Sequence, residues 1–132
     1  MSLLNMLLKF ALGLLMMAAG LNHFRNPSFY LRMMPDYLPS PEALVVLSGL
    51  AEMLVGALLL VPRFSRLAAW ALIALLLAVF PANVNMALHP EQFPEFSSTG
   101  LWVRLPIQGL LILWAWWYTR PEAPAAPLPR AG

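Results

Sequence analysis

The chain has 132 residues, of which 61% are hydrophobic and only 11% charged, against roughly 45–50% apolar and about 25% charged residues in soluble domains. This composition indicates an integral membrane protein. The chain contains no cysteine, which excludes disulfides, thiol redox chemistry and thiolate metal sites. Its net charge of +2 comes from few, dispersed residues, so it lacks the basic cluster that nucleic-acid binding requires.

The first apolar run covers residues 3–24. At about 1.5 Å per residue it can cross a bilayer core of about 30 Å, and it exceeds the roughly 7–15 apolar residues of a signal peptide. We therefore expect a retained helix. Residues 25–41 carry four prolines among several aromatic side chains. Prolines at that density prevent a long helix and aromatic residues suit the headgroup zone, so this segment is predicted to lie at the membrane interface.

Three further apolar runs follow, over residues 42–61, 67–89 and 101–119, with short turns between them. Residues 121–132 are rich in proline and alanine and have no apolar period, as is typical of disorder. The sequence therefore predicts an all-α fold, an antiparallel bundle of four transmembrane helices with a short interfacial segment between the first and second helices. This domain covers residues 1–120 and is followed by a disordered tail.

The basic residues are distributed unequally between the two sides of the predicted bundle. If the four helices cross alternately, the side of the amino terminus holds Lys9, Arg63, Arg66, Arg120 and Arg130, and the other side holds Arg25, Arg32 and Arg104. The positive-inside rule places the more basic side in the cytoplasm. We therefore expect an inner (plasma) membrane protein with both termini in the cytoplasm.

Polar side chains gather in the half of the bundle away from the termini. Ser48 and Glu52 are four residues apart, as are Arg104 and Gln108, so each pair projects from one side of its helix. Polar groups inside a membrane are costly and usually functional, which predicts a shared ligand pocket. The predicted pocket residues are Asn22, His23, Ser48, Glu52, Asn83, Asn85, Arg104 and Gln108.

Glu52 is the most informative of these residues. It lies about ten residues inside its run, roughly 15 Å from the helix end and near the membrane midplane. Desolvation there disfavours the carboxylate, so Glu52 is expected to be protonated at rest and to be the candidate proton-exchange group. Counted along the helices, this depth separates Glu52 from His23 and His89, so no metal site is expected.

Two features of the helices bear on their packing. Gly13 and Gly20 are seven residues apart in the first run, and Gly49 and Gly56 are seven apart in the second. Small residues with this period let two helices approach closely, which predicts a tight antiparallel pair. Pro81 interrupts the third run and frees a carbonyl one turn back, so another helix is expected to supply a hydrogen bond there.

Several motifs, taken in order, resemble the DoxX-like family of small four-helix membrane proteins. They are Gly20-x-x-His23-Phe24, the proline-spaced stretch 35–41, Ser48-Gly49-x-x-Glu52, Pro81-Ala82-Asn83-x-x-Met86 and Arg104-Leu105-Pro106-x-Gln108. The resemblance covers nearly all of residues 3–119. It implies a four-helix membrane bundle, and some members of that family are associated with quinone-linked oxidoreductases. It implies no settled activity, and whether the chain is itself an enzyme stays open.

Three classes of function remain open. In the first, the chain is a redox-associated, quinone-linked membrane subunit in which His23, Gln108 or an asparagine binds the quinone oxygens and Glu52 exchanges protons. In the second it is a small-solute carrier, and in the third a scaffold or assembly partner for another membrane protein. Haem between His23 and His89 fits less well, since both lie at helix ends. We expect the first class, with the lipid bilayer and a membrane redox partner or a second copy of the chain as partners.

Overall fold

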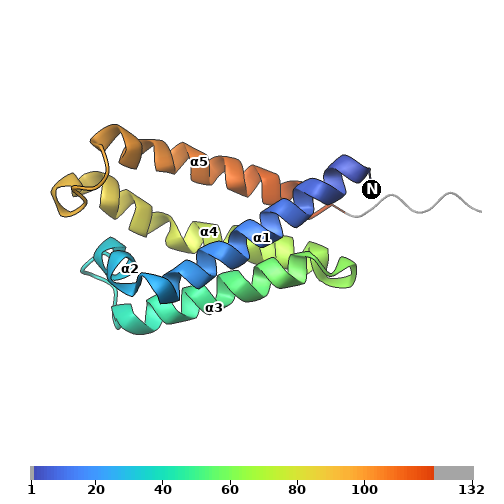
Figure 1. Cartoon of the computed structure of the whole chain (residues 1–132), viewed down its shortest axis with the longest axis horizontal. Helices are drawn as coiled ribbons and strands as arrows, with labels where there is room; N and C mark the ends of the chain where they lie inside the picture. Colours follow the sequence, from blue (N-terminus) through green and yellow to red (C-terminus); the bar gives the residue numbers. More distant parts are fainter. Residues whose placement is uncertain (1, 121–132) are drawn as a thin grey trace, which may run out of the picture.

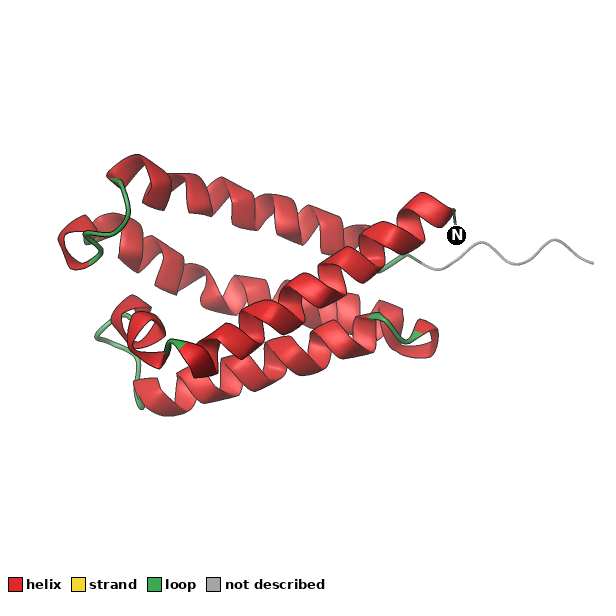
Figure 2. Cartoon of the chain, viewed as in Figure 1, coloured by secondary structure: helices red, strands yellow, loops and turns green. Residues whose placement is uncertain are grey.

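The computed structural model describes residues 2–120, and the predicted tail, residues 121–132, lies outside the described residues. Within the described part the fold is all-α, as predicted, and has no strand (Figure 2). Its α-helices are α1 (Leu3–Arg25), α2 (Pro27–Met33), α3 (Pro41–Leu59), α4 (Ser65–Leu88) and α5 (Ser98–Trp117). Two short 3₁₀ turns, η1 (Pro62–Phe64) and η2 (Pro90–Gln92), precede and follow α4.

Capping residues and prolines set the helix starts. The Ser2 hydroxyl accepts a hydrogen bond from the Asn5 amide at the start of α1, and the Ser97 hydroxyl accepts one from the Gly100 amide at the start of α5. These bonds satisfy amides that have no partner inside the helix. α2 and α3 begin with Pro27 and Pro41 instead, because a proline lacks the amide that would otherwise be unpaired there.

The four long helices run alternately up and down (Figure 1). α1 packs closely along α3, α3 packs on α4, and α4 packs on α5. The short α2 lies across the end of the bundle where α1 ends and α3 begins. We call that end, with the turn between α4 and α5, the α2 half. The other end, with the start of α1, the α3–α4 turn and the end of α5, is the basal half.

Glycines bring α1 and α3 into backbone contact, as their spacing predicts. A Cβ atom added at Gly20 would lie 2.6 Å from the Gly49 carbonyl oxygen, and one added at Gly56 would lie 2.6 Å from the Gly13 carbonyl oxygen. Such distances are far below van der Waals contact, so no larger residue fits without moving a helix. The glycine seam, defined as these four residues, therefore fixes the register of α1 against α3.

Three helical segments are long and apolar enough to cross a membrane, namely Leu3–Arg25, Pro41–Leu59 and Pro62–Leu88. The sequence predicted four, and α5 does not meet the same criterion. The first half of α5 is diluted by Arg104, Pro106 and Gln108, and by serine, threonine and glycine in its first turn, while its tryptophans are only weakly apolar on hydropathy scales.

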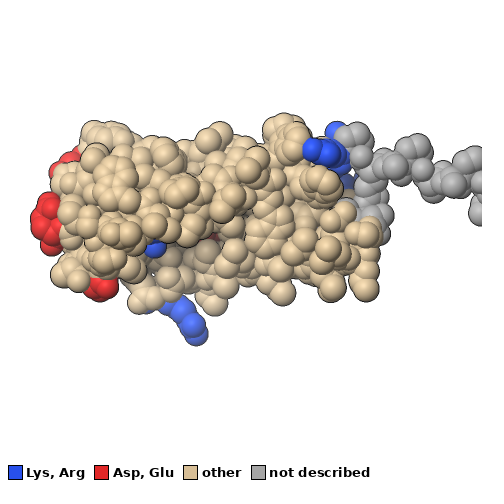
Figure 3. All heavy atoms as spheres, turned by 90° about the horizontal axis from the view of Figure 1, so that it is seen from above, with Lys and Arg blue, Asp and Glu red and all other residues tan. Residues whose placement is uncertain are grey.

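The surface of the molecule is divided in the manner of a membrane protein. Figure 3 shows acidic side chains at one end, basic side chains at the other, and further basic side chains part of the way along from the acidic end, while most of the remaining visible face is uncharged. Large apolar side chains are widely exposed on the helices; Leu47, Leu54 and Leu77, for example, are 59–62% exposed. Exposed apolar surface of this extent suits contact with lipid.

The buried apolar residues form two clusters. The larger fills the basal half with residues from α1, α3, α4 and α5, among them the fully buried Leu12, Leu59 and Leu72. The smaller lies beneath α2 and includes Met33, Met86 and Phe93. The candidate site lies in the α2 half, next to both clusters.

Candidate functional site

A cavity of about 390 Å³ lies in the α2 half and is bounded by all five α-helices. Its wall combines apolar and polar side chains. The apolar members are Met16, Ala19, Met33, Met34, Leu76, Val79, Ala82, Ile107 and Leu111, and the polar ones are His23, Tyr30, Ser48, Glu52, Asn83, Arg104 and Gln108. The volume is near the lower end of the roughly 300–1,000 Å³ typical of small-molecule sites.

Six of the eight residues predicted for the pocket line this cavity, and Asn22 and Asn85 do not. The Asn22 amide donates to the Tyr30 hydroxyl at 2.7 Å, and the Asn85 amide donates to the Met33 carbonyl at 3.0 Å. Both amides therefore hold α2 in place. A role in ligand binding stays a prediction for the six residues that the structure brings together.

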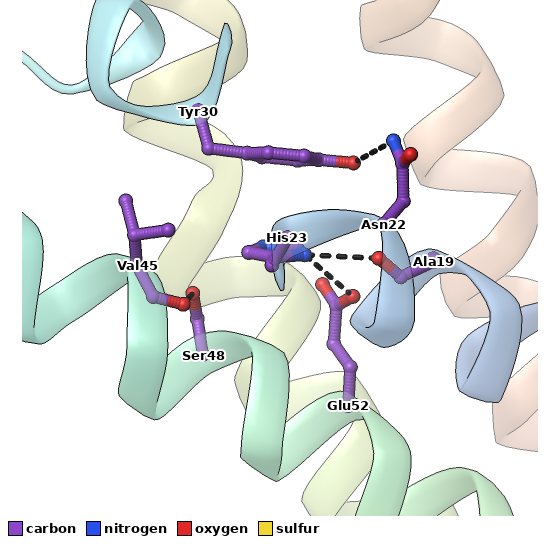
Figure 4. Close-up of polar contacts among 7 residues, drawn as sticks. All are labelled: Ala19, Asn22, His23, Tyr30, Val45, Ser48 and Glu52. Atoms are coloured by element: carbon purple, nitrogen blue, oxygen red, sulfur yellow. Dashed lines mark hydrogen bonds and ion pairs between the residues drawn. The ribbon is translucent and has the colours of Figure 1, made fainter. Parts of the chain in front are cut away.

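Glu52 and His23 meet at one wall of the cavity, with 3.6 Å between Glu52 Oε2 and His23 Nδ1 (Figure 4). The prediction that depth separates these residues was wrong. Depth was counted along the helix axes, whereas side chains lean toward the amino terminus of their own helix. α1 and α3 run in opposite directions, so His23 leans toward the basal half and Glu52 toward the α2 half. The glycine seam brings the two helices close enough for contact.

The hydrogen bonds leave the Glu52 carboxyl without a partner. His23 Nδ1 lies 2.9 Å from the Ala19 carbonyl oxygen, and a carbonyl can only accept, so Nδ1 carries the hydrogen. The 3.6 Å to Glu52 Oε2 is too long for a further hydrogen bond. Among the described residues Oε2 is a buried polar atom with no hydrogen-bond partner, and Glu52 is only 9% exposed. Leaving such a group unsatisfied costs about 1–3 kcal/mol.

Tyr30 covers His23 on the side of α2. The two rings stack with their centroids 3.8 Å apart and their planes at 16°. Figure 4 shows Tyr30, His23 and Glu52 in successive layers. Burial raises the pKa of the Tyr30 hydroxyl, against the opposing effect of the hydrogen bond from Asn22, so Tyr30 is a neutral phenol at physiological pH. The sequence did not identify Tyr30 as a site residue. Its only sequence signal is that it is an aromatic residue in the interfacial segment, seven residues after His23.

The opposite wall holds a chain of hydrogen bonds between α4 and α5. Arg104 Nε donates to Asn83 Oδ1 at 3.3 Å, and Asn83 Nδ2 donates to Gln108 Oε1 at 2.6 Å. Gln108 Nε2 in turn donates to the Leu76 carbonyl. This last bond lies next to the carbonyl that Pro81 deprives of its amide. The freed carbonyl itself belongs to Leu77, and among the described residues no side chain donates to it, so the hydrogen bond that the proline predicted is not found.

The polar lining therefore divides into satisfied and unsatisfied groups. Ser48 is satisfied within its own helix, because its hydroxyl donates to the Val45 carbonyl at 3.1 Å. The terminal guanidinium nitrogens of Arg104 make no hydrogen bond to the described residues, nor does the Glu52 carboxyl. The cavity thus presents donors on one wall, a carboxyl group on another and apolar surface between them. Such a site can hold a largely apolar molecule by a polar head.

Only one of the two histidines lies at the cavity. His23 lines the cavity, whereas His89 is not among the lining residues. His89 Nδ1 lies 2.9 Å from the Asn85 carbonyl at the end of α4, which is a helix-end contact. The structure therefore does not bring the two histidines to a shared cavity, and it gives the haem alternative no support.

Comparison with curated proteins finds no match, and comparison with solved structures finds none either. A family model does match, over residues 12–119, and it carries the description "Domain of unknown function (DUF8561)". The resemblance to the DoxX-like family was therefore wrong. Its motifs are short and made of residue types common in membrane helices, so their order alone did not identify a family. Because the match covers more than half of the sequence, the chain belongs to the DUF8561 family.

Proposed function

We propose that this chain is an integral membrane protein that binds a small, largely apolar molecule by a polar head, in the cavity of the α2 half. The observation that carries the proposal is the Glu52 carboxyl, which is buried at the cavity wall with no hydrogen-bond partner among the described residues. Buried polar groups are nearly always paired. A ligand hydroxyl would pair it by donating to the carboxylate, and a ligand oxygen such as that of a quinone would pair it by accepting from the protonated carboxyl.

Arg104 supports the same proposal from the other wall. Its Nε is bonded to Asn83, which orients the guanidinium, and the terminal nitrogens remain available. These would bind an oxygen acceptor on the ligand head. A head with both an acceptor and a donor would satisfy Arg104 and Glu52 together.

A quinone is the specific ligand that we retain, in a redox-associated membrane subunit. Reduction of a quinone to a quinol takes up two electrons and two protons. The electrons would come from a membrane redox partner, and Glu52 beside His23 would exchange protons with the ligand oxygen. With the DoxX-like resemblance overturned, this version is supported by the cavity alone.

The carrier alternative gains no support. A carrier needs a polar path through both halves, and the basal half is filled by the larger apolar cluster, in which Leu12, Leu59 and Leu72 are fully buried. The scaffold alternative treats the polar groups as bonds between helices. It accounts for Asn83 and Gln108, and it does not account for an unpaired carboxyl at a cavity.

We infer further that α5 crosses the membrane with the three other helices and that both termini face the cytoplasm. α5 has 20 residues, about 30 Å, and packs along α4. Single cysteines replacing Phe64 and Ser98, which are both exposed, test this topology because the chain has no other cysteine. An impermeant thiol reagent on intact cells should label the Ser98→Cys variant and not the Phe64→Cys variant. The reverse pattern would overturn the orientation.

Mass spectrometry of organic extracts tests the binding function. The full chain is purified in native lipid discs, and its extract is compared with that of the Glu52→Leu variant. We expect a small molecule enriched over bulk lipid in the wild type and lost in the variant. Glu42→Leu is the matched control, since Glu42 is on the same helix, exposed and outside the cavity. If no molecule is enriched, or if Glu52→Leu retains it, the proposal is wrong.

A further inference from the structure

The α1–α5 side of the bundle is the loosest among the described helices. α1 packs along α3, and α5 packs along α4, but α1 and α5 do not pack closely on each other. In the basal half they are joined where the Tyr118 hydroxyl donates to the Asn5 carbonyl at 3.2 Å. Figure 1 shows the two helices diverging from there toward the α2 half. The bundle is therefore wedge-shaped on this side, and the cavity lies within the wedge.

We place the opening of the cavity to the surface between these two helices. Ala19 of α1 and Ile107 of α5 both line it, and Ile107 is also 48% exposed. The neighbouring surface of α5 is apolar, with Val103 45% and Leu110 64% exposed. If all four long helices cross the membrane, as proposed above, this rim faces hydrocarbon and not water. The route into the cavity on this side is thus through the lipid.

The α2 side of the cavity is closed by comparison. Tyr30 stacks on His23, and Met33 is only 7% exposed. Arg32 on the outer face of α2 donates to the Gln92 carbonyl at 2.9 Å and to Glu95 Oε1 at 2.7 Å, which ties α2 to the turn between α4 and α5. A water-soluble ligand would have to displace this cover, and a lipid-soluble one would not.

The size of the cavity restricts the ligand further. About 390 Å³ is enough for a ring or a carboxylic head with a few carbons. A hydrocarbon chain longer than the remaining space must leave through the opening. We propose that the gap between α1 and α5 admits the oxygen-bearing head of a single-chain amphiphile from the bilayer. The head then pairs with Arg104 and Glu52, and the chain stays in the lipid beyond Ala19 and Ile107. This inference rests on the proposed binding function.

Two bulky substitutions at the rim test the route. Ala19→Trp and Ile107→Trp place an indole in the opening, one from each helix. Ala18→Trp and Leu113→Trp are the matched controls, because these residues are exposed on the same helices and do not line the cavity. The Ala19 carbonyl that accepts from His23 belongs to the backbone, so the substitution leaves that bond available. Thermal unfolding of all four variants establishes that they are folded.

Binding to the full-length protein in lipid discs is measured with decylubiquinone and oleic acid as separate probes. Each probe is compared with the same head group without its hydrocarbon tail. We expect one probe to bind to the wild type. Its affinity should be about tenfold or more weaker in the two rim variants and unchanged in the two controls. The chainless head should bind far more weakly. Binding of decylubiquinone alone would identify a quinone-type head, and binding of oleic acid alone a carboxylate-type head.

The outcomes distinguish a wrong entry route from a wrong binding function. If a probe binds equally well to the wild type and both rim variants, or if the chainless head binds as tightly, the lateral route is wrong and the binding function stands. If neither probe binds to the wild type and no small molecule is found in its extract, the proposed function itself is wrong.

Discussion

The two halves of the bundle differ in whether their buried charged side chains form hydrogen bonds. In the basal half Lys9 is 5% exposed, and its ammonium donates to the Ser65 hydroxyl at 3.1 Å. That hydroxyl in turn donates to the Leu59 carbonyl at 2.8 Å, and a cation near the end of α3 is favoured by the helix dipole. In the α2 half Glu52 is almost as buried and has no hydrogen bond among the described residues. The contrast supports the proposal that Lys9 stabilises the fold whereas Glu52 binds a ligand.

The largest expected effect tests the packing of the two halves. Leu72 is fully buried in the larger cluster, whereas Val79, two turns along the same helix, lines the cavity. Leu72→Ala should lower the free energy of unfolding by about 2–5 kcal/mol, because it opens a new void in a packed core. Val79→Ala only enlarges an existing space and should cost clearly less. Unfolding in detergent measures both, and equal losses would mean that the cavity is filled in the folded protein.

The glycine seam gives the next effect. Gly20→Ala places a Cβ atom 2.6 Å from the Gly49 carbonyl oxygen, so α1 and α3 must separate, at about 1–3 kcal/mol for overpacking. Gly109→Ala is the control, since a Cβ atom there meets nothing within 4 Å. Its better helix propensity should make that variant neutral or slightly more stable. Thermal midpoints that fall equally for both would contradict close packing at the seam.

Substitution of Glu52 should affect binding more than folding. Glu52→Leu strands no hydrogen-bond partner, because Ser48 donates to Val45, Gln108 to Leu76 and His23 to Ala19. Removing an unpaired buried carboxyl should therefore leave the free energy of unfolding within about 1 kcal/mol of wild type, or raise it. Glu52→Gln should be similarly small.

Unfolding measurements on the ligand-free protein test this expectation. Ser48→Ala serves as a control for a side chain at the same wall that is paired within its own helix. A large loss of stability in Glu52→Leu would mean that Glu52 and His23 form a structural ion pair, which would remove the main support for a ligand.

Much of the fold followed from local sequence signals. Apolar runs and prolines located the helices, and the seven-residue glycine spacing indicated which helix α1 would pack against. α5 was less predictable as a membrane span, because Arg104, Pro106 and Gln108 interrupt its apolar pattern. Arg104 and Gln108 also line the cavity and bond to α4. Whether such a helix spans depends on its neighbours and not on its own composition.

The candidate site was predictable in its membership and less so in its contacts. Alternating helices place the polar residues at one end, which is why six of eight line a single cavity. Asn22 and Asn85 were misplaced because α2, which both of them bind, was predicted only as an interfacial segment. The approach of Glu52 to His23 depends on side-chain direction and on the register of two helices. Counting residues from the helix ends gives no information about side-chain direction or about register.

The smallest expected effect concerns the cover of the α2 half. The hydrogen bond from Arg32 lowers the pKa of the Glu95 carboxyl below its usual range. A group with a lowered pKa in the folded state adds stability above its unfolded pKa, and that stability is lost as pH falls through the folded value. The pair is exposed to solvent, so the effect on unfolding should be slight. Its titration is the more sensitive readout.

Carbon-detected NMR of labelled glutamate in lipid discs should show Glu95 titrating at a higher pH in Arg32→Gln than in wild type. Arg25→Gln is the control, because this exposed arginine at the end of α1 makes no hydrogen bond to Glu95. If Arg32→Gln leaves the titration unchanged, the tether between α2 and the α4–α5 turn does not form at the membrane surface. α2 would then be held by the hydrogen bonds of Asn22 and Asn85 and by its apolar packing. A cover held in that way could admit a ligand from water, so this small shift also bears on whether the lipid route between α1 and α5 is needed.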